Sequence, residues 1–178
     1  MLNYMKSELY RTVRNRNLQI FTCICATLML ALVVVLKFFG QDPTFTYANT
    51  RFALGNLYMQ MKMVLLVAIV FSAFMHDNEE RNHTIKHSVA FGIKRSTIYL
   101  GRFFVQVFVS SLIYIGLVTI FTVFSYMMLS HKNTGELESL IRVSFGSFTS
   151  LVAALAVTHF FFMVSENQNT AYVAHLAF

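Results

Sequence analysis

The chain alternates long apolar runs with short polar stretches. Apolar residues dominate residues 18–39, 57–75, 103–129 and 143–164. About 20 apolar residues in a helix cross the hydrocarbon core of a bilayer, and a soluble core would not need several runs that lack a polar face. The pattern predicts an all-α, polytopic membrane protein in which at least four helices form one transmembrane domain.

Residues 1–17 have a different periodicity. Apolar residues recur at spacings of three and four, and a second face carries Lys6, Tyr10 and Arg14. This pattern predicts an amphipathic helix in the membrane interface, with its basic side towards lipid headgroups. The alternative is the ordinary charged flank of the first span. The apolar stripe comprises Leu2, Met5, Leu9 and Val13.

A polar stretch at 76–102 separates the second run from the third. Apolar residues such as Val89, Phe91 and Ile93 still recur within it, which a solvated linker would not need. We expect a compact element that lies against the membrane and leaves one face free for a partner.

The composition agrees with a membrane protein. Hydrophobic residues make up 56% and charged residues 12% of the chain, and the mean hydropathy is +0.58, whereas soluble domains have about 25% charged residues. The net charge of +6 favours anionic lipid headgroups over nucleic acid as a partner. Cys23 and Cys25 are two residues apart on one helix, so they cannot pair with each other there.

The distribution of Lys and Arg predicts the orientation. Nine such residues lie in the N-terminal segment and the central stretch, and three lie in the two remaining loops. The N-terminus and 76–102 are therefore expected in the cytoplasm, and 41–56 and 131–138 outside. The nine are Lys6, Arg11, Arg14, Arg16, Arg81, Lys86, Lys94, Arg95 and Arg102; the three are Arg51, Lys132 and Arg142.

Some residues within the predicted spans are polar or small. Gln60 and Lys62 lie in the first turns of the second span, where Lys62 either snorkels to the interface or lines a polar path. Small residues recur every four positions in the fourth span, a ridge that lets another helix approach closely. For His159 we expect a buried, hydrogen-bonded side chain rather than a proton relay. The ridge consists of Gly146, Ser150, Ala154 and Thr158.

Motifs of catalysis are missing from the sequence. There is no G-x-x-x-x-G-K-[ST], no G-x-S-x-G and no H-E-x-x-H, so no phosphate loop, serine-hydrolase or zincin signature is present. His83 and His87 are four residues apart and would lie on one helical face, which is compatible with metal ligation. Such a pair on a charged loop is usually ordinary surface, and we expect no metal and no cofactor in this chain.

The central stretch contains a series of short elements in a fixed order. Glu80 is followed by Thr84-Ile85-Lys86, Gly92-Ile93-Lys94-Arg95 and Ile98-Tyr99-Leu100-Gly101-Arg102. This order resembles the connection between the second and third helices of ABC-2 type (type V-like) permeases. The N-terminal amphipathic "elbow" also fits that family. His83 stands where glycine is common, and Arg102 replaces the usual lysine and keeps its charge.

The resemblance implies the permease subunit of an ABC transporter in the plasma membrane, similar to small bacterial bacteriocin-immunity, peptide and drug exporters. It implies a second permease subunit and two separate ATPase subunits, which would hold ATP and Mg²⁺. The central stretch would carry the coupling helix that contacts the ATPase. The residues expected there are Glu79, Glu80, Arg81, Thr84, Ile85, Lys86, Val89, Phe91 and Arg95.

Two further expectations complete the sequence interpretation. Residues 171–178 begin another apolar run, and the family has six spans, so a fifth span is expected to start there in a longer chain. The alternative functions are a non-transporting membrane scaffold or sensor subunit and a metal-dependent membrane enzyme that uses His83 and His87.

Overall fold

A computed structural model describes residues 2–42, 45–59, 70, 72–73, 94–130 and 135–164. Within these ranges the elements are helices, and the one β-type pairing is an isolated parallel bridge between Asn49 and Ser130. The all-α prediction is therefore confirmed for this part of the chain. The helices are α1 (Leu2–Val13), α2 (Arg16–Phe39), α3 (Thr50–Met59), α6 (Arg95–Met128) and α7 (Gly135–Val164).

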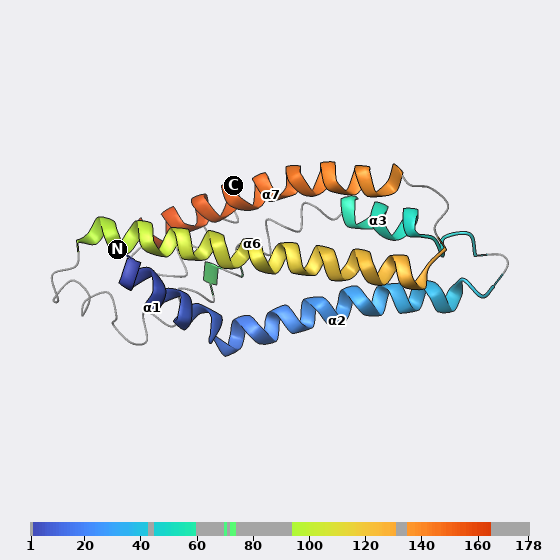
Figure 1. Ribbon diagram of the computed structural model, residues 1–178, viewed down its shortest axis with the longest axis horizontal. Coiled ribbons are helices and arrows are strands. Elements are labelled where there is room, and N and C mark those ends of the chain that lie inside the picture. Colours follow the sequence, from blue (N-terminus) through green and yellow to red (C-terminus); the bar gives the residue numbers. More distant parts are fainter. Residues whose placement is uncertain are drawn as a thin grey trace.

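The long helices α2, α6 and α7 lie side by side along the long axis of the molecule (Figure 1). One end, which we call the N-terminal end, holds α1, the first turns of α2 and α6 and the last turns of α7. The other, the loop end, holds the last turns of α2 and α6 and the first turns of α3 and α7. Helices α2 and α6 run from the N-terminal end to the loop end, and α7 runs back.

Among the described residues, three helices are long and apolar enough to cross a membrane: Arg16–Phe39, Ser96–Met128 and Ile141–Phe161. They correspond to the runs predicted at 18–39, 103–129 and 143–164. With 34 residues, α6 is about 51 Å long at 1.5 Å per residue, so it extends beyond a hydrocarbon core of about 30 Å. Most of the predicted second span, 57–75, and all of 171–178 lie outside the described residues.

The connection predicted as a loop over 41–56 ends earlier than expected. Helix α3 begins at Thr50 because the Asn49 side chain caps it, accepting a hydrogen bond from the Phe52 amide at 2.8 Å. The same connection is fixed to the end of α6, since the amide and hydroxyl of Thr50 both donate to the Ser130 carbonyl, at 3.2 and 3.0 Å.

Helix α1 packs on the bundle. Met5 and Leu9 contact a buried cluster formed by Leu18 of α2 and by Val105 and Val109 of α6. An N-cap starts α2 directly after the bend, where the Asn15 side chain accepts from the Asn17 amide at 3.0 Å. Two residues of the predicted stripe therefore face protein, whereas Val13 is exposed because the helix ends there.

A second cluster fills the loop end. Val33 and Leu36 of α2 pack against Ala53 and Leu54 of α3 and Phe121 of α6, together with Leu129.

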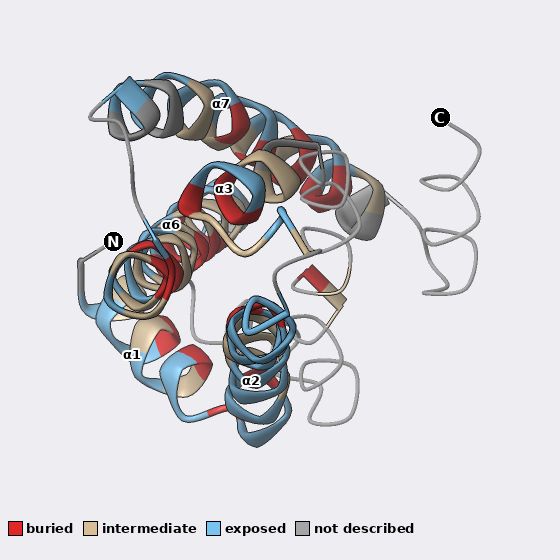
Figure 2. Ribbon diagram, turned by 90° about the vertical axis from the view of Figure 1, so that its right-hand side faces the viewer, coloured by how far each residue is buried: buried red, intermediate tan, exposed pale blue. Residues whose placement is uncertain are grey.

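A third cluster joins α7 to α6. Leu151, Ala154 and Leu155 of α7 pack against Val107 and Tyr114 of α6. Viewed from the end, buried residues occupy the sides of α3, α6 and α7 that face one another (Figure 2).

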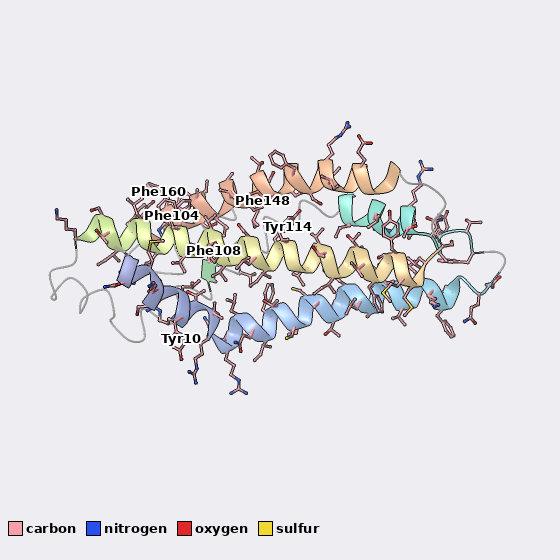
Figure 3. All side chains as sticks on the ribbon, in the orientation of Figure 1. Tyr10, Phe104, Phe108, Tyr114, Phe148 and Phe160 are labelled. Carbon is pink, nitrogen blue, oxygen red and sulfur yellow. The ribbon has the colours of Figure 1, made fainter. Side chains whose placement is uncertain are left out.

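The outer faces of the long helices are apolar. At most 28% of any candidate span is buried within the described structure. Large exposed side chains, including Phe104, Phe108 and Phe160, cover α6 and α7 (Figure 3). Apolar surface on this scale is costly in water and is the expected outer surface of a membrane-embedded, multi-pass bundle.

Candidate functional site

Polar side chains are buried at the N-terminal end, along one face of α6. Arg102, Gln106 and Ser110 follow one another at four-residue spacing, and all three are buried. Polar groups inside an apolar bundle are expensive and therefore mark functional sites. We call the groups assembled around Arg102 and Gln106 the buried polar cluster.

The first half of the cluster joins α1 to α6. The Arg102 Nε atom donates a hydrogen bond of 3.0 Å to the Tyr4 hydroxyl and lies 3.9 Å from a carboxylate oxygen of Glu8. Arg11, one turn further along α1, also donates to this carboxylate. Glu8 is only 8% exposed and Arg102 only 5%. Because an unpaired charge at this depth would be strongly destabilising, the ion pair fixes α1 against α6.

Gly101 makes room for this contact. A Cβ atom at that position would lie 3.0 Å and 3.1 Å from the Cδ1 and Cε1 atoms of the Tyr4 ring. Those distances are too short for ordinary packing, so any larger residue would displace the ring. The glycine beside Arg102 thus allows Tyr4 to reach the guanidinium group.

The second half of the cluster joins α6 to α7. The Gln106 amide nitrogen donates to the Ser72 hydroxyl, and its carbonyl oxygen lies 3.2 Å from Nδ1 of His159. The His159 ring is fully buried and lies against the rings of Tyr99 and Phe103, with centroids 4.7 and 5.6 Å away. Gln106 can accept from His159 only if Nδ1 carries the proton. The prediction of a buried, hydrogen-bonded histidine is confirmed.

These contacts link four parts of the chain within two turns of α6. Helix α1 is joined through Glu8, α7 through His159 and the second apolar run through Ser72. A movement of the first turns of α6 would be transmitted to all of these segments. The described contacts of this site therefore connect helices to one another.

Most of the expected coupling residues lie outside the described part of the chain. This applies to Glu79, Glu80, Arg81, Thr84, Ile85, Lys86, Val89 and Phe91, to Gln60 and Lys62, and to His83 and His87. Arg95 is the first residue of α6, so the expected coupling stretch leads directly into the helix that carries the cluster.

The small-residue ridge is divided between two environments. Ala154 and Thr158 are buried against the bundle, whereas Gly146 and Ser150 are exposed. A Cβ atom at Gly146 would meet no described atom within 4 Å. Close approach of another helix at Gly146 remains a prediction, which a second subunit would have to satisfy.

No metal centre is found among the described residues, where no group of three or more His, Cys, Asp or Glu side chains converges. Cys23 and Cys25 are free thiols on α2. The polar spacing of Arg102, Gln106 and Ser110 was readable in the sequence, but the two partners that complete the cluster, Glu8 and His159, are distant from it along the chain.

In comparisons with known proteins, no family model, no curated protein and no solved structure matches this chain. The function must therefore be inferred from the buried polar cluster and from the sequence.

Proposed function

We propose that this chain is the permease subunit of an ABC transporter, which moves a substrate across the plasma membrane with energy from a separate ATPase. The observation that carries the proposal is the ionic attachment of α1 to the first turns of α6, through Glu8, Arg11 and Arg102. Helix α6 begins at Arg95, directly after the stretch that resembles a coupling helix. A partner that displaces this stretch would therefore move α6 and α1 together.

The position of the junction supports the same function. The start of α6, α1 and the last turns of α7 lie at one end of the bundle (Figure 1). With the N-terminus in the cytoplasm, as the Lys and Arg distribution predicts, an ATPase would bind at this end. Gln106 and His159 would then carry the displacement to α7, where the exposed Gly146 would face a second permease subunit.

The proposed complex has two permease subunits and two ATPases that hold ATP and Mg²⁺, and this chain contributes no catalytic residue. Its N-terminal helix acts as the elbow, and the complete permease has four or more spans, six if it follows the family. The substrate class is that of the similar exporters, an antimicrobial peptide, drug or lipid-like molecule. A scaffold or sensor subunit would need no ATPase, so the presence of that partner distinguishes the two functions.

The first step is to look for an ABC ATPase gene beside the gene of this chain. The experiment is then copurification of the chain with that ATPase, combined with measurement of ATP hydrolysis. Burial of a Phe side chain contributes about 1.5–3 kcal/mol, so Phe91→Ala should weaken ATPase binding roughly tenfold to hundredfold. Arg102→Met should instead leave binding intact and reduce substrate-stimulated hydrolysis, because it alters the junction behind the contact. Arg142→Gln, an exposed cation at the loop end, is the control.

Two results would contradict the proposal. One is an ATPase that binds and is stimulated equally by all of these variants. The other concerns orientation: a single cysteine at Gln41, exposed at the loop end, should react with an impermeant thiol reagent in intact cells, and one at Lys94 should not. The reverse labelling would place the junction on the wrong side of the membrane for an ATPase.

A further inference from the structure

A shallow, open strip of surface, which we call the groove, runs along the outer face of α2 from the N-terminal end towards the middle of the helix. It has a volume of about 580 Å³, and the described residues that line it all belong to α2. They follow the helical spacing of three and four, so they form one continuous face. The lining residues are Arg16, Gln19, Ile20, Cys23, Ile24, Thr27 and Leu28.

The groove changes from polar to apolar along its length. Arg16 and Gln19 are at its start, and Ile20, Ile24 and Leu28 follow. Thr27 does not interrupt the apolar part, because its hydroxyl is satisfied by the Cys23 carbonyl at 2.8 Å. The helix rises about 18 Å from Arg16 to Leu28, which is close to one leaflet of a hydrocarbon core about 30 Å thick.

Positive charge collects at the polar start of the groove. Arg16 lines the groove and Arg14 precedes it by two residues; both are exposed, and in the described structure no acidic side chain pairs with either of them. The Arg14 guanidinium donates to the Tyr10 hydroxyl at 2.5 Å and lies over the Tyr10 ring, 5.8 Å from its centroid. Tyr10 itself projects from the outer side of α1 (Figure 3). Glu8 cannot neutralise these cations, because Arg11 and Arg102 already share its carboxylate.

We propose that this groove is a binding site for an anionic phospholipid, with Arg16 and the neighbouring cations at the phosphate and one acyl chain along Ile20, Ile24 and Leu28. Along the groove, Arg16 would lie at the lipid headgroup, the Gln19 amide at the glycerol region, and the aliphatic side chains beside the acyl chain. The site depends only on the position of α2 in the membrane, so it stands apart from the proposed transport function.

Charge also argues against a protein occupant. A helix from a second copy of this chain would bring its own Arg14 and Arg16 to the same end of the bundle in a parallel arrangement, and like charges repel. A zwitterionic lipid would fill the apolar part but would bring its own cation close to Arg16. An anionic headgroup is the ligand that neutralises the cations and leaves the aliphatic part of the groove covered.

The test uses the full chain in nanodiscs that contain equal amounts of phosphatidylglycerol and phosphatidylcholine, followed by native mass spectrometry of the lipids retained. We expect preferential retention of phosphatidylglycerol. Arg16→Gln should reduce that preference about fivefold, the effect of removing one cation near an anionic surface. Ile24→Ser should lower retention of both lipids and leave the preference unchanged. Arg51→Gln removes an exposed cation at the loop end and should have no effect.

Three outcomes would overturn the proposal. Equal retention of the two lipids by the unaltered chain would mean that the groove is ordinary lipid-facing surface. If Arg51→Gln reduced the preference for phosphatidylglycerol as much as Arg16→Gln does, net charge alone would attract the anionic lipid. A change in the measured mass of the assembly on Ile24→Ser would mean that the groove is a contact between subunits.

Discussion

Removal of the Glu8 carboxylate tests whether the ion pair between α1 and α6 holds the N-terminal end together. In Glu8→Gln, Arg102 keeps its hydrogen bond to Tyr4 but loses the negative charge of the Glu8 carboxylate, which lies 3.9 Å from its Nε atom. Arg102 is 5% exposed, so water cannot replace the lost charge. Breaking a buried pair by removing one partner costs about 3–5 kcal/mol, and the long distance favours the lower figure.

The chain contains a matched control for this substitution. Glu138 and Arg142 form an ion pair of 3.2 Å between neighbouring turns of α7, but their side chains are 77% and 80% exposed. Exposed pairs at this helical spacing contribute about 0.3–0.5 kcal/mol. Glu138→Gln removes the same group from the same kind of partner, so the difference between the two variants isolates the effect of burial.

The measurement is the temperature at which half of the purified protein in detergent loses its size-exclusion peak. For a chain of this size, 1 kcal/mol corresponds to about 2–4 °C, so a loss of about 3 kcal/mol predicts a shift of roughly 6–12 °C for Glu8→Gln. Glu138→Gln should shift the midpoint by no more than about 2 °C. Arg102→Met introduced into Glu8→Gln should recover much of the loss, because an apolar pair can replace a buried ion pair.

The reasoning would be refuted by equal shifts for Glu8→Gln and Glu138→Gln. It would also be refuted if the double variant were less stable than Glu8→Gln alone, because the two losses would then be independent and the two side chains would not form a pair.

Two further predictions concern glycines. A Cβ atom at Gly40 would lie 2.2 Å from that of Ala48, so Gly40→Ala should lower the thermal midpoint by the equivalent of about 1–3 kcal/mol. Gly116 has open space around it, so Gly116→Ala should not lower the midpoint. Equal effects of the two substitutions would mean that the connection after α2 adjusts freely to the added methyl group. Gly146→Leu should leave the midpoint of the single subunit unchanged and weaken subunit association measured by crosslinking, and unchanged association would mean that this part of α7 faces lipid.

Several features of this protein are determined by local sequence. Apolar runs of sufficient length with few charges specify the three candidate spans because the backbone can satisfy its own hydrogen bonds in a helix and the side chains need only be apolar. The spacing of three and four in 1–17 indicates a helix, which the structure contains as α1, and the side chains of Asn15 and Asn49 cap α2 and α3.

Only the tertiary structure decided what these helices contact. The stripe containing Met5 and Leu9 was predicted to face the membrane interface, but both residues pack against buried residues of α2 and α6. Local patterns cannot distinguish these neighbours, because lipid chains and aliphatic side chains are equally apolar. The pairing of Glu8 with Arg102 and of Gln106 with His159 joins residues far apart along the chain. It follows from the relative rotation and register of α1, α6 and α7, which no single segment encodes.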